Sequence, residues 1–411
     1  MTDPTGRSFL SYRRSHSYEA ALLIVAQHDR GIPTWQDIHN LDEKPLGPEL
    51  RQVLNDPEIA NAVLWITPDF PDSTVIQRIE APVIFDRARK QTSFFVIPFL
   101  AGGLDYDKAK DVIDPVYGQE DLSLWSVRKV NGNPIDYAEA AQIANLVLHR
   151  RLREIHKHLP KGEPLRMELN TRKRLAWESG KALLLDWKDR FDDRLAKPGE
   201  WEQFLLPALE DVAQAIEQCA PGRAIEVGGI PALPAAVALG VCFRAVRRLK
   251  ISWRQFTPGR DDQLWNIEQR REPSEFKAEI RDHDATGDDL AVLVMVNDDV
   301  EPAFQATRKD LPALRGIVRV TKAGGIRHEL ATPGEALDVA HIVVNAINQA
   351  RSDFRVIKCV HLFMAVPAGL AMMIGQLLNK IPAIQTYELV SEDGVNRYVP
   401  AARLRPSDSE G

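Results

Sequence analysis

The residues best suited to binding an anion follow two buried strands, each of which leads into a helix opened by proline. In residues 224–256 a strand ends at Gly229 and Pro231 opens an apolar helix, and in residues 356–390 Pro367 has the same place. Free N–H groups at a helix N-terminus attract anions, and α/β sheets bind ligands beyond the carboxyl ends of their strands. The pattern therefore predicts two anion-binding turns.

These two stretches are copies of one pattern. Pro231 precedes Gly240 by nine residues and Pro367 precedes Gly375 by eight, so the copies differ by one insertion. A short strand follows each helix, and a strand and a further helix precede each stretch. Each copy is thus a strand, a helix, a strand, a proline-started helix and a strand, which indicates an internal duplication.

Other chemical signatures are missing from the sequence. It contains no G-x-G-x-x-G or Walker motif, which argues against cofactor-style dinucleotide binding and P-loop ATPase activity. Cys219, Cys242 and Cys359 are far apart and lack metal-site spacing, so we expect reduced, buried thiols in a cytoplasmic protein. His156 and His158 fall on different faces of a helix. We expect no metal and no bound cofactor.

Composition narrows the possible partners. The chain has 411 residues, of which 44% are hydrophobic, as in soluble proteins of two or three domains. A net charge of −6 argues against duplex nucleic acid as a partner but leaves room for a local cationic pocket. The apolar run 360–378 is interrupted by His361, Pro367 and Gly369, so we expect no membrane span. Residues 1–14 contain no apolar core of signal-peptide length.

Strands alternate with helices along the chain, which predicts an α/β fold with parallel sheets. Residues 102–133 are expected to be irregular and residues 260–284 to form an exposed polar excursion. The predicted divisions are a head of residues 1–156, a linker of 157–169, and a second region of 170–411 with lobes of about 170–285 and 286–411.

An ordered set of motifs resembles a TIR domain and covers the head. The motifs are FLSYRR before a helix (Phe9–Arg14), GIPTWQD (Gly31–Asp37), PLGPELRQVL (Pro45–Leu54), NAVLWITPDF (Asn61–Phe70) and a following Ser/Thr…Glu helix. The resemblance implies a flavodoxin-like, doubly wound parallel sheet. It also implies cleavage of the N-glycosidic bond between nicotinamide and ribose in NAD+, which is a substrate here and not a cofactor.

The resemblance assigns catalysis to Glu80. Enzymatic TIR domains carry a glutamate on the helix after the third strand, six residues beyond a Ser or Thr, and Thr74 matches that residue. A carboxylate there stabilises the positive charge of an oxocarbenium-like transition state. The Trp-Cys pair common before this glutamate is absent, because Ile76 and Gln77 stand there. The alternative for Glu80 is a solvated helix carboxylate.

The expected NAD+ contacts lie at the ends of the first two strands. Trp35 and Asp37 suit a ring and a ribose hydroxyl, and Arg13 suits the pyrophosphate. Ser11 and Tyr12 are expected to line the same cleft. The alternative for Trp35 is packing beneath the loop.

The run HLFMAVPAGLAMMIG (His361–Gly375) and the closing strand with Tyr387 are similar to those of a SAVED domain, which consists of two fused CARF-like Rossmannoid lobes. This resemblance covers Leu165–Leu404. It implies binding of a cyclic oligonucleotide messenger, here expected to be a cyclic trinucleotide, in bacterial antiphage defence (CBASS). The whole chain then resembles a TIR–SAVED effector that its ligand assembles into an oligomer or filament.

A cyclic trinucleotide presents phosphates and bases, so its pocket needs cations, helix N-termini and surfaces for bases. Lys188 and Arg190 are the expected phosphate partners, with ordinary exposed charges as the alternative, and Phe363 has a place in the core as its alternative. The residues predicted to bind the ligand are Trp187, Lys188, Arg190, Gly229, Pro231, Asn297, Asp298, Phe363, Met364 and Pro367.

The expected activity is that of an NAD+ glycohydrolase (NADase) that works when ligand has assembled the chain. Two alternatives stay open. In one, the head is a non-enzymatic TIR scaffold that recruits a partner on ligand binding. In the other, the sensor half degrades its ligand.

Overall fold

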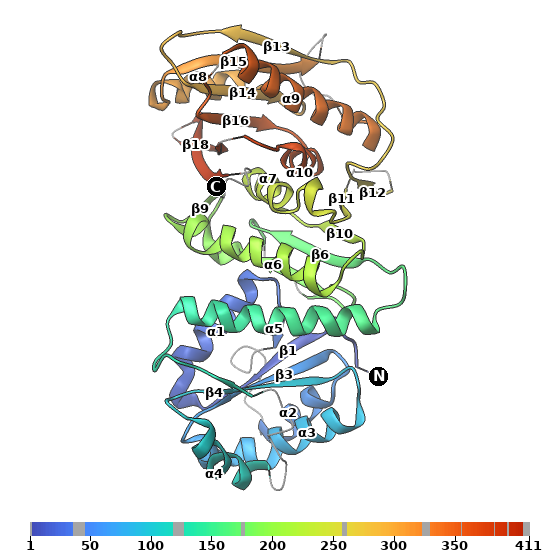
Figure 1. Cartoon of the computed structure of the whole chain (residues 1–411), viewed down its shortest axis with the longest axis vertical. Helices are drawn as coiled ribbons and strands as arrows, with labels where there is room; N and C mark the ends of the chain where they lie inside the picture. Colours follow the sequence, from blue (N-terminus) through green and yellow to red (C-terminus); the bar gives the residue numbers. More distant parts are fainter. Residues whose placement is uncertain are drawn as a thin grey trace. The chain divides into compact units, whose positions relative to one another are not determined.

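The computed structural model describes residues 2–35, 46–117, 127–173, 177–256, 261–322, 329–354, 356–381, 383–392 and 394–405 (Figure 1). Asp37 lies outside these residues. The chain divides into two compact units. Unit 1 comprises Met1–Glu168, Ala176–Leu185 and Gln214–Pro221, and unit 2 comprises Leu169–Leu175, Asp186–Ala213 and Gly222–Gly411.

Unit 1 is built on a parallel sheet with the strand order β2-β1-β3-β4-β5, which is the order of flavodoxin-like sheets. Every residue of the central strand β3 is buried, as expected for a strand covered on both faces. The strands are β1 (Arg7–Ser11), β2 (Thr34–Trp35), β3 (Ile59–Ile66), β4 (Phe95–Leu100) and β5 (Arg128–Lys129).

Helices cover both faces of this sheet. Helices α1 and α5 pack together on one face, and α2, α3 and α4 lie on the other (Figure 1). Residues 102–133, expected to be irregular, contain α4 and β5. The helices are α1 (Ser17–Asp29), α2 (Leu46–Asn55), a π turn (Ile76–Glu80), α3 (Ala81–Lys90), α4 (Tyr106–Tyr117) and α5 (Tyr137–His158). The predicted doubly wound α/β head is confirmed as a fold.

The predicted linker, residues 157–169, is corrected by the structure. It contains the end of α5 and most of strand β6 (Leu165–Asn170). Alternate residues of β6 are buried, a strand pattern hidden in the sequence by the flanking charges and prolines. The predicted strand at residues 182–187 is β7 (Leu183–Asp186), and the boundary between the units falls within both β6 and β7.

Unit 2 contains a six-stranded sheet in the order β13-β15-β14-β16-β17-β18. Its four inner strands are parallel, and the edge strands β13 and β18 are antiparallel to their neighbours. Separately, β10 pairs in parallel with β11, and β12 pairs antiparallel to β11. The strands are β10 (Ile225–Gly228), β11 (Ile251–Gln255), β12 (Gln263–Trp265), β13 (Phe276–Asp282), β14 (Asp289–Met295), β15 (Leu314–Lys322), β16 (Cys359–Ala365), β17 (Ile384–Glu392) and β18 (Val395–Leu404).

The predicted polar excursion, residues 260–284, is also corrected, because it contains β12 and β13. Strand β13 pairs with β15 along its whole length, so it belongs to the second lobe and the lobe boundary precedes residue 276. Its alternation of charged and apolar residues is that of an exposed edge strand. The many charged residues of β13 made this two-residue period hard to recognise in the sequence.

The proline-started helices of the two copies pack directly against each other. A Cβ added at Gly240 would overlap the carbonyl oxygen of Met372, and one added at Gly375 would overlap that of Val237. The two glycines therefore allow the backbones of α7 and α10 to touch. The helices of unit 2 are α6 (Leu206–Cys219, which continues into unit 1) after a π turn (Trp201–Leu205), α7 (Leu233–Cys242), α8 (Glu301–Thr307), α9 (Pro333–Asp353) and α10 (Ala368–Leu377).

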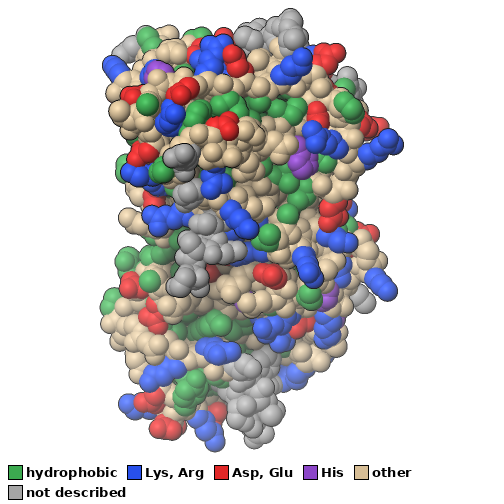
Figure 2. Space-filling view, turned by 45° about the horizontal axis from the view of Figure 1, so that its top comes forward, with side chains coloured by type: hydrophobic (Ala, Val, Ile, Leu, Met, Phe, Trp, Pro, Cys, Tyr) green, Lys and Arg blue, Asp and Glu red, His purple; other side chains and the backbone are tan. Residues whose placement is uncertain are grey.

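Two features of the described residues bear on partners. None of their helices is both long enough and apolar enough to cross a membrane. On the face shown in Figure 2, Lys and Arg side chains are interspersed with Asp and Glu, so the residues drawn in colour offer no continuous basic surface there.

Candidate functional site

In unit 1 the fold brings together two of the residues predicted for NAD+ cleavage. Ser11 is the last residue of β1, and Glu80 ends the π turn before α3. The Ser11 hydroxyl donates a hydrogen bond of 2.5 Å to Glu80 Oε2, joining residues 69 positions apart. Both side chains are buried, so Glu80 is not a solvated helix carboxylate. Single π turns inside helices are frequent at functional sites.

Beside this pair, Arg13 is held by an anion of the protein itself. Its Nε lies 3.5 Å from Asp69 Oδ2, in the turn after β3. Burial opposes ionisation of Asp69, but hydrogen bonds from Ser15 and Thr67 and the charges of His16 and Arg13 lower its pKa to about 2. Asp69 is therefore a permanent anion at neutral pH. It fixes the guanidinium of Arg13 at the carboxyl edge of the sheet.

The predicted role of Trp35 in stacking on NAD+ is corrected. Its indole is 5% exposed and stacks on Phe9, with 5.5 Å between ring centroids. A ring packed in the core has no free face for a ligand, so Trp35 is a core residue. Tyr12 is half-buried beside Ser11.

Three of the residues predicted to contact the cyclic nucleotide are core residues of unit 2. Trp187 is fully buried and packs edge-on against Trp201. Phe363 is also fully buried and stacks on Tyr387 at 4.3 Å, and Met364 is 5% exposed. Side chains buried in the core offer no surface to a base, which corrects these three assignments. An apolar residue near a strand end has the same sequence pattern in a core and in a pocket.

The two predicted phosphate partners have different surroundings. Arg190 donates a hydrogen bond to Glu200 at 2.8 Å, and its guanidinium lies 4.2 Å from the ring centroid of Phe204. Its charge is therefore paired within the protein and stacked on an aromatic ring. Lys188 is half-buried just beyond β7, and its ammonium pairs with no carboxylate in the described part of the chain. Lys188 therefore remains suited to a ligand phosphate, whereas Arg190 is a mostly buried structural charge and not the ordinary exposed charge of the alternative.

The turn before α7, the first of the two predicted anion-binding turns, is held by hydrogen bonds within the protein. Gly229 has φ +122°, and a Cβ there would come within 2.9 Å of Asn170 Oδ1. Asn170 accepts a hydrogen bond from the N–H of Ile230 at 2.9 Å, and Thr171 accepts one from Ala232 at 2.7 Å. Pro231, which lies between Ile230 and Ala232 in the sequence, is buried. The end of β6 thus holds this turn in place.

The equivalent region of the second lobe brings Asn297 and Pro367 to the ends of neighbouring strands. The N–H of Asn297 donates to the carbonyl of Ala365 at 2.8 Å, which joins the end of β14 to the end of β16. Asn297 and Asp298 are exposed, and Pro367 is the N-cap residue of α10. All three lie at the carboxyl edge of the parallel strands, as predicted.

A cluster of three charged residues was missed in the sequence. Glu388, on β17, is 4% exposed, and its Oε1 accepts from Arg172 at 2.8 Å. A nitrogen of Arg194 lies 4.0 Å from the same oxygen. Glu388 also accepts from the backbone N–H of Leu233, the first residue of α7. A glutamate flanked by Tyr387 and Leu389 within a predicted strand is the sequence signal that would have found it.

The pKa of Glu388 in this cluster is well above that of an ordinary glutamate. Burial raises the pKa of Glu388 to about 7, although Arg172, Arg194 and the Leu233 N–H favour its charged form. Tyr398 lies near the same carboxylate, and burial raises its pKa so that it stays neutral. Glu388 therefore exchanges its proton close to neutral pH.

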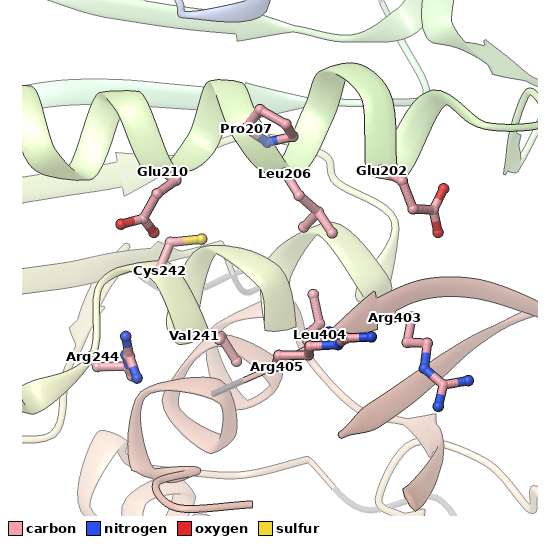
Figure 3. A pocket seen from close by; sticks show the side chains of 10 residues that line it. All are labelled: Glu202, Leu206, Pro207, Glu210, Val241, Cys242, Arg244, Arg403, Leu404 and Arg405. Atoms are coloured by element: carbon pink, nitrogen blue, oxygen red, sulfur yellow. The ribbon is translucent and has the colours of Figure 1, made fainter. Parts of the chain in front are cut away.

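A cavity of about 460 Å³ lies at the opposite end of α7 (Figure 3). It is formed by the early turns of α6, the end of α7 and the end of β18, and no predicted site residue lines it. Its charged lining comprises Glu202, Glu210, Arg244, Arg403 and Arg405. Burial, followed by the charge of Glu210, raises the pKa of Cys242 in its wall to about 12, so that thiol is not a nucleophile at neutral pH.

Part of the chain matches a known protein family. Residues 208–404 match the family model described as "SMODS-associated and fused to various effectors sensor domain", or SAVED. Residues 208–404 form a SAVED domain. The SAVED resemblance, predicted for Leu165–Leu404, is thereby confirmed for residues 208–404, whereas the TIR resemblance of the head stays a prediction. No curated protein matches the chain.

Two solved structures are similar in fold to most of this chain. Both are of the Acinetobacter baumannii Cap4 SAVED/CARF-domain containing receptor. The structure with 3'3'3'-cAAA has a TM-score of 0.51 at 15% identity and covers 96% of this chain and 99% of that chain. The structure with 2'3'3'-cAAA has a TM-score of 0.50 at 15% identity, covering 89% and 87%. Identity this low shows a SAVED/CARF-like α/β fold and no more.

No cluster of three or more His, Cys, Asp or Glu side chains arranged to hold a metal ion occurs within the ranges that the structure describes.

Proposed function

We propose that this chain is a cyclic-oligonucleotide-activated NAD+ hydrolase of bacterial antiphage defence (CBASS). The observation that carries the proposal is the SAVED domain at residues 208–404, because that family is described as a sensor fused to effectors. The similar Cap4 receptor was solved with two cyclic trinucleotides, which supports the same class of ligand. The head, with its buried Ser11–Glu80 pair, is then the effector.

The sensor site lies at the carboxyl edge of the strands of unit 2. The turn at Gly229 leads into α7, whose first N–H, that of Leu233, faces an anion, and Lys188 adds a cation without a carboxylate partner among the described residues. Asn297 supplies an amide that both donates and accepts, which suits the edge of a base. These groups match a ring of alternating riboses and phosphates that carries a base on each ribose.

The chemical step in the head breaks the bond between ribose C1′ and the nicotinamide nitrogen. The bonding electrons leave with nicotinamide, which becomes neutral, and positive charge spreads over C1′ and the ribose ring oxygen. Glu80 stabilises that charge, and Ser11 fixes the orientation of the carboxylate through its hydrogen bond. Water then adds to C1′ and releases a proton, which gives ADP-ribose.

Ligand binding activates the head through assembly. Head-to-tail contacts that do not close into a ring produce an open filament, which brings several heads together. Moving a chain from mostly inactive to mostly active requires about 5 kcal/mol of differential ligand affinity, or the same coupling shared by several protomers. A ligand with several phosphates and bases has enough contacts to supply it.

The deciding experiment measures nicotinamide release from NAD+ by the purified chain with a panel of cyclic di-, tri- and tetranucleotides. Release with one of them, and none without ligand, supports the proposal. Demonstrated binding of a ligand with no release contradicts the enzymatic part and favours the scaffold function. One observation favours that function: Ile76 and Gln77 replace the Trp-Cys pair, and Gln77 bonds to the carbonyl of Pro71. Loss of intact ligand during the assay would reveal a ligand-degrading sensor.

Arg172→Gln is expected to weaken binding of the activating cyclic oligonucleotide about tenfold, because it removes a charged hydrogen-bond donor from the carboxyl edge of unit 2. Isothermal titration calorimetry measures the affinity. The matched control is Arg403→Gln, in the cavity of Figure 3, which we expect to leave affinity unchanged. The reverse result would place the ligand in that cavity.

A further inference from the structure

We propose that Glu388 holds the place of a ligand phosphate, and that Arg172, Arg194 and the first N–H of α7 form a phosphate site which the ligand enters by displacing the Glu388 carboxylate. This inference rests on the proposed sensor function and specifies how one phosphodiester of the ligand is recognised. The sequence predicted an anion at the start of α7, and in the structure the protein supplies one from its own β17.

The geometry around Glu388 is that of an anion site. Arg172 reaches its Oε1 at 2.8 Å, Arg194 lies at 4.0 Å, and the N–H of Leu233 donates to the carboxylate. Guanidinium groups and helix N-terminal N–H groups are the partners that proteins use for phosphate. Both arginine side chains remain partly exposed, at 33% and 45%, so solvent reaches the cluster from their side.

An unsatisfied donor beside the same turn provides independent support. Asn170 is fully buried, and its Oδ1 accepts from Ile230 in the turn that leads into α7. The amide nitrogen on the same carbon has no hydrogen-bond partner among the described residues, nor does Nε of Arg172. A buried donor without a partner is costly and requires a reason. A phosphate oxygen entering at the turn is an acceptor that these two donors lack.

Protonation of Glu388 is coupled to this exchange. The charged and titratable groups near it are Arg172 and Arg194, Tyr398 on β18, and Asp298 and Asp299, which influence Tyr398. A protonated Glu388 is neutral and releases both arginines, whereas an ionised one competes with phosphate for them. Phosphodiesters keep their charge at neutral pH. Ligand therefore binds the protonated form better, and binding takes up a proton.

The sign of the pH dependence follows from this coupling. Because the pKa of Glu388 in the free protein is about 7 and bound phosphate raises it further, affinity increases as the pH falls toward 7 and levels off below it. One linked proton limits the slope to about tenfold per pH unit.

The experiment measures ligand affinity of the full chain by calorimetry between pH 6 and pH 8.5. Glu388→Gln is expected to bind the activating cyclic oligonucleotide about tenfold more tightly at pH 8.5, with a flat pH profile. Adding Arg172→Gln to it removes this gain. The matched control is Glu392→Gln, an exposed glutamate of β17 paired with Arg397, which keeps the wild-type profile. Weaker binding by Glu388→Gln, or an unchanged slope, overturns the inference.

A second probe separates failure of this inference from failure of the proposed function. If the wild-type chain binds no cyclic oligonucleotide, the sensor function fails, and inorganic pyrophosphate then tests the phosphate site alone. Tighter pyrophosphate binding by Glu388→Gln than by Arg172→Gln/Glu388→Gln supports the site, and equal binding overturns it. If Glu388→Gln does not fold, carbon-13 NMR of the wild-type carboxyl replaces it. Saturating anion, cyclic oligonucleotide or else pyrophosphate, must then raise the Glu388 pKa, and an unchanged pKa overturns the inference.

Discussion

Glu80→Gln is expected to lower ligand-stimulated release of nicotinamide from NAD+ by roughly 10³-fold while leaving cyclic-oligonucleotide affinity unchanged. Glutamine has nearly the same shape as glutamate and accepts the hydrogen bond from Ser11, so the change removes little more than the negative charge. That charge acts on the transition state, where the ribose becomes positive. The loss should therefore appear in kcat and in kcat/KM alike.

Two further variants test whether the effect belongs to this carboxylate. Asp86→Asn removes an exposed carboxylate of the following helix α3, where it pairs with Lys90 at 2.8 Å, and we expect wild-type activity. Ser11→Ala removes the group that orients Glu80 and is expected to cost about tenfold in kcat with little change in KM. Full activity of Glu80→Gln would disprove the catalytic assignment. The proposed sensor function would stand.

Gly375→Val is expected to destabilise unit 2 by about 3 kcal/mol or more, because the added side chain forces α7 and α10 apart. A Cβ at Gly375 overlaps the carbonyl of Val237 and lies 3.0 Å from the Cα of Gly240. Backbone atoms in the middle of packed helices do not move aside cheaply. Gly240→Val should have a similar cost, since a Cβ there lies 2.9 Å from the Cα of Gly375.

Urea unfolding followed by circular dichroism measures this loss. The matched control is Gly228→Ala in the same repeat, whose new Cβ would meet nothing nearer than 4.0 Å and whose backbone is not left-handed. We expect it to be close to neutral. A Gly375→Val chain as stable as wild type would mean that the helices are not in backbone contact, and the paired-repeat account of α7 and α10 would fail.

The sequence by itself determined the class of fold and the repeated pattern. Strand and helix periods, the prolines that open helices and the spacing from Pro231 to Gly240 and from Pro367 to Gly375 are local features, readable without tertiary contacts. They led correctly to an α/β head and to α/β structure in the second region, and family resemblance led to the SAVED domain, whereas the predicted five-element copies lack α8 and β15, which lie between β14 and α9. Weak local signals failed where charge masked a strand, as at β6 and β13.

Only the tertiary structure decided which chemical groups meet. Trp187 and Phe363 have the residue types of a base platform, but burial of their rings is set by packing against other elements of the fold. Glu388 meets Arg172 across 216 positions of sequence, and Ser11 meets Glu80 across 69. Residue type and spacing specify the local backbone, whereas burial and pairing depend on which distant elements pack together. The sequence therefore placed the anion-binding turn at α7, and the fold showed that Glu388 occupies it.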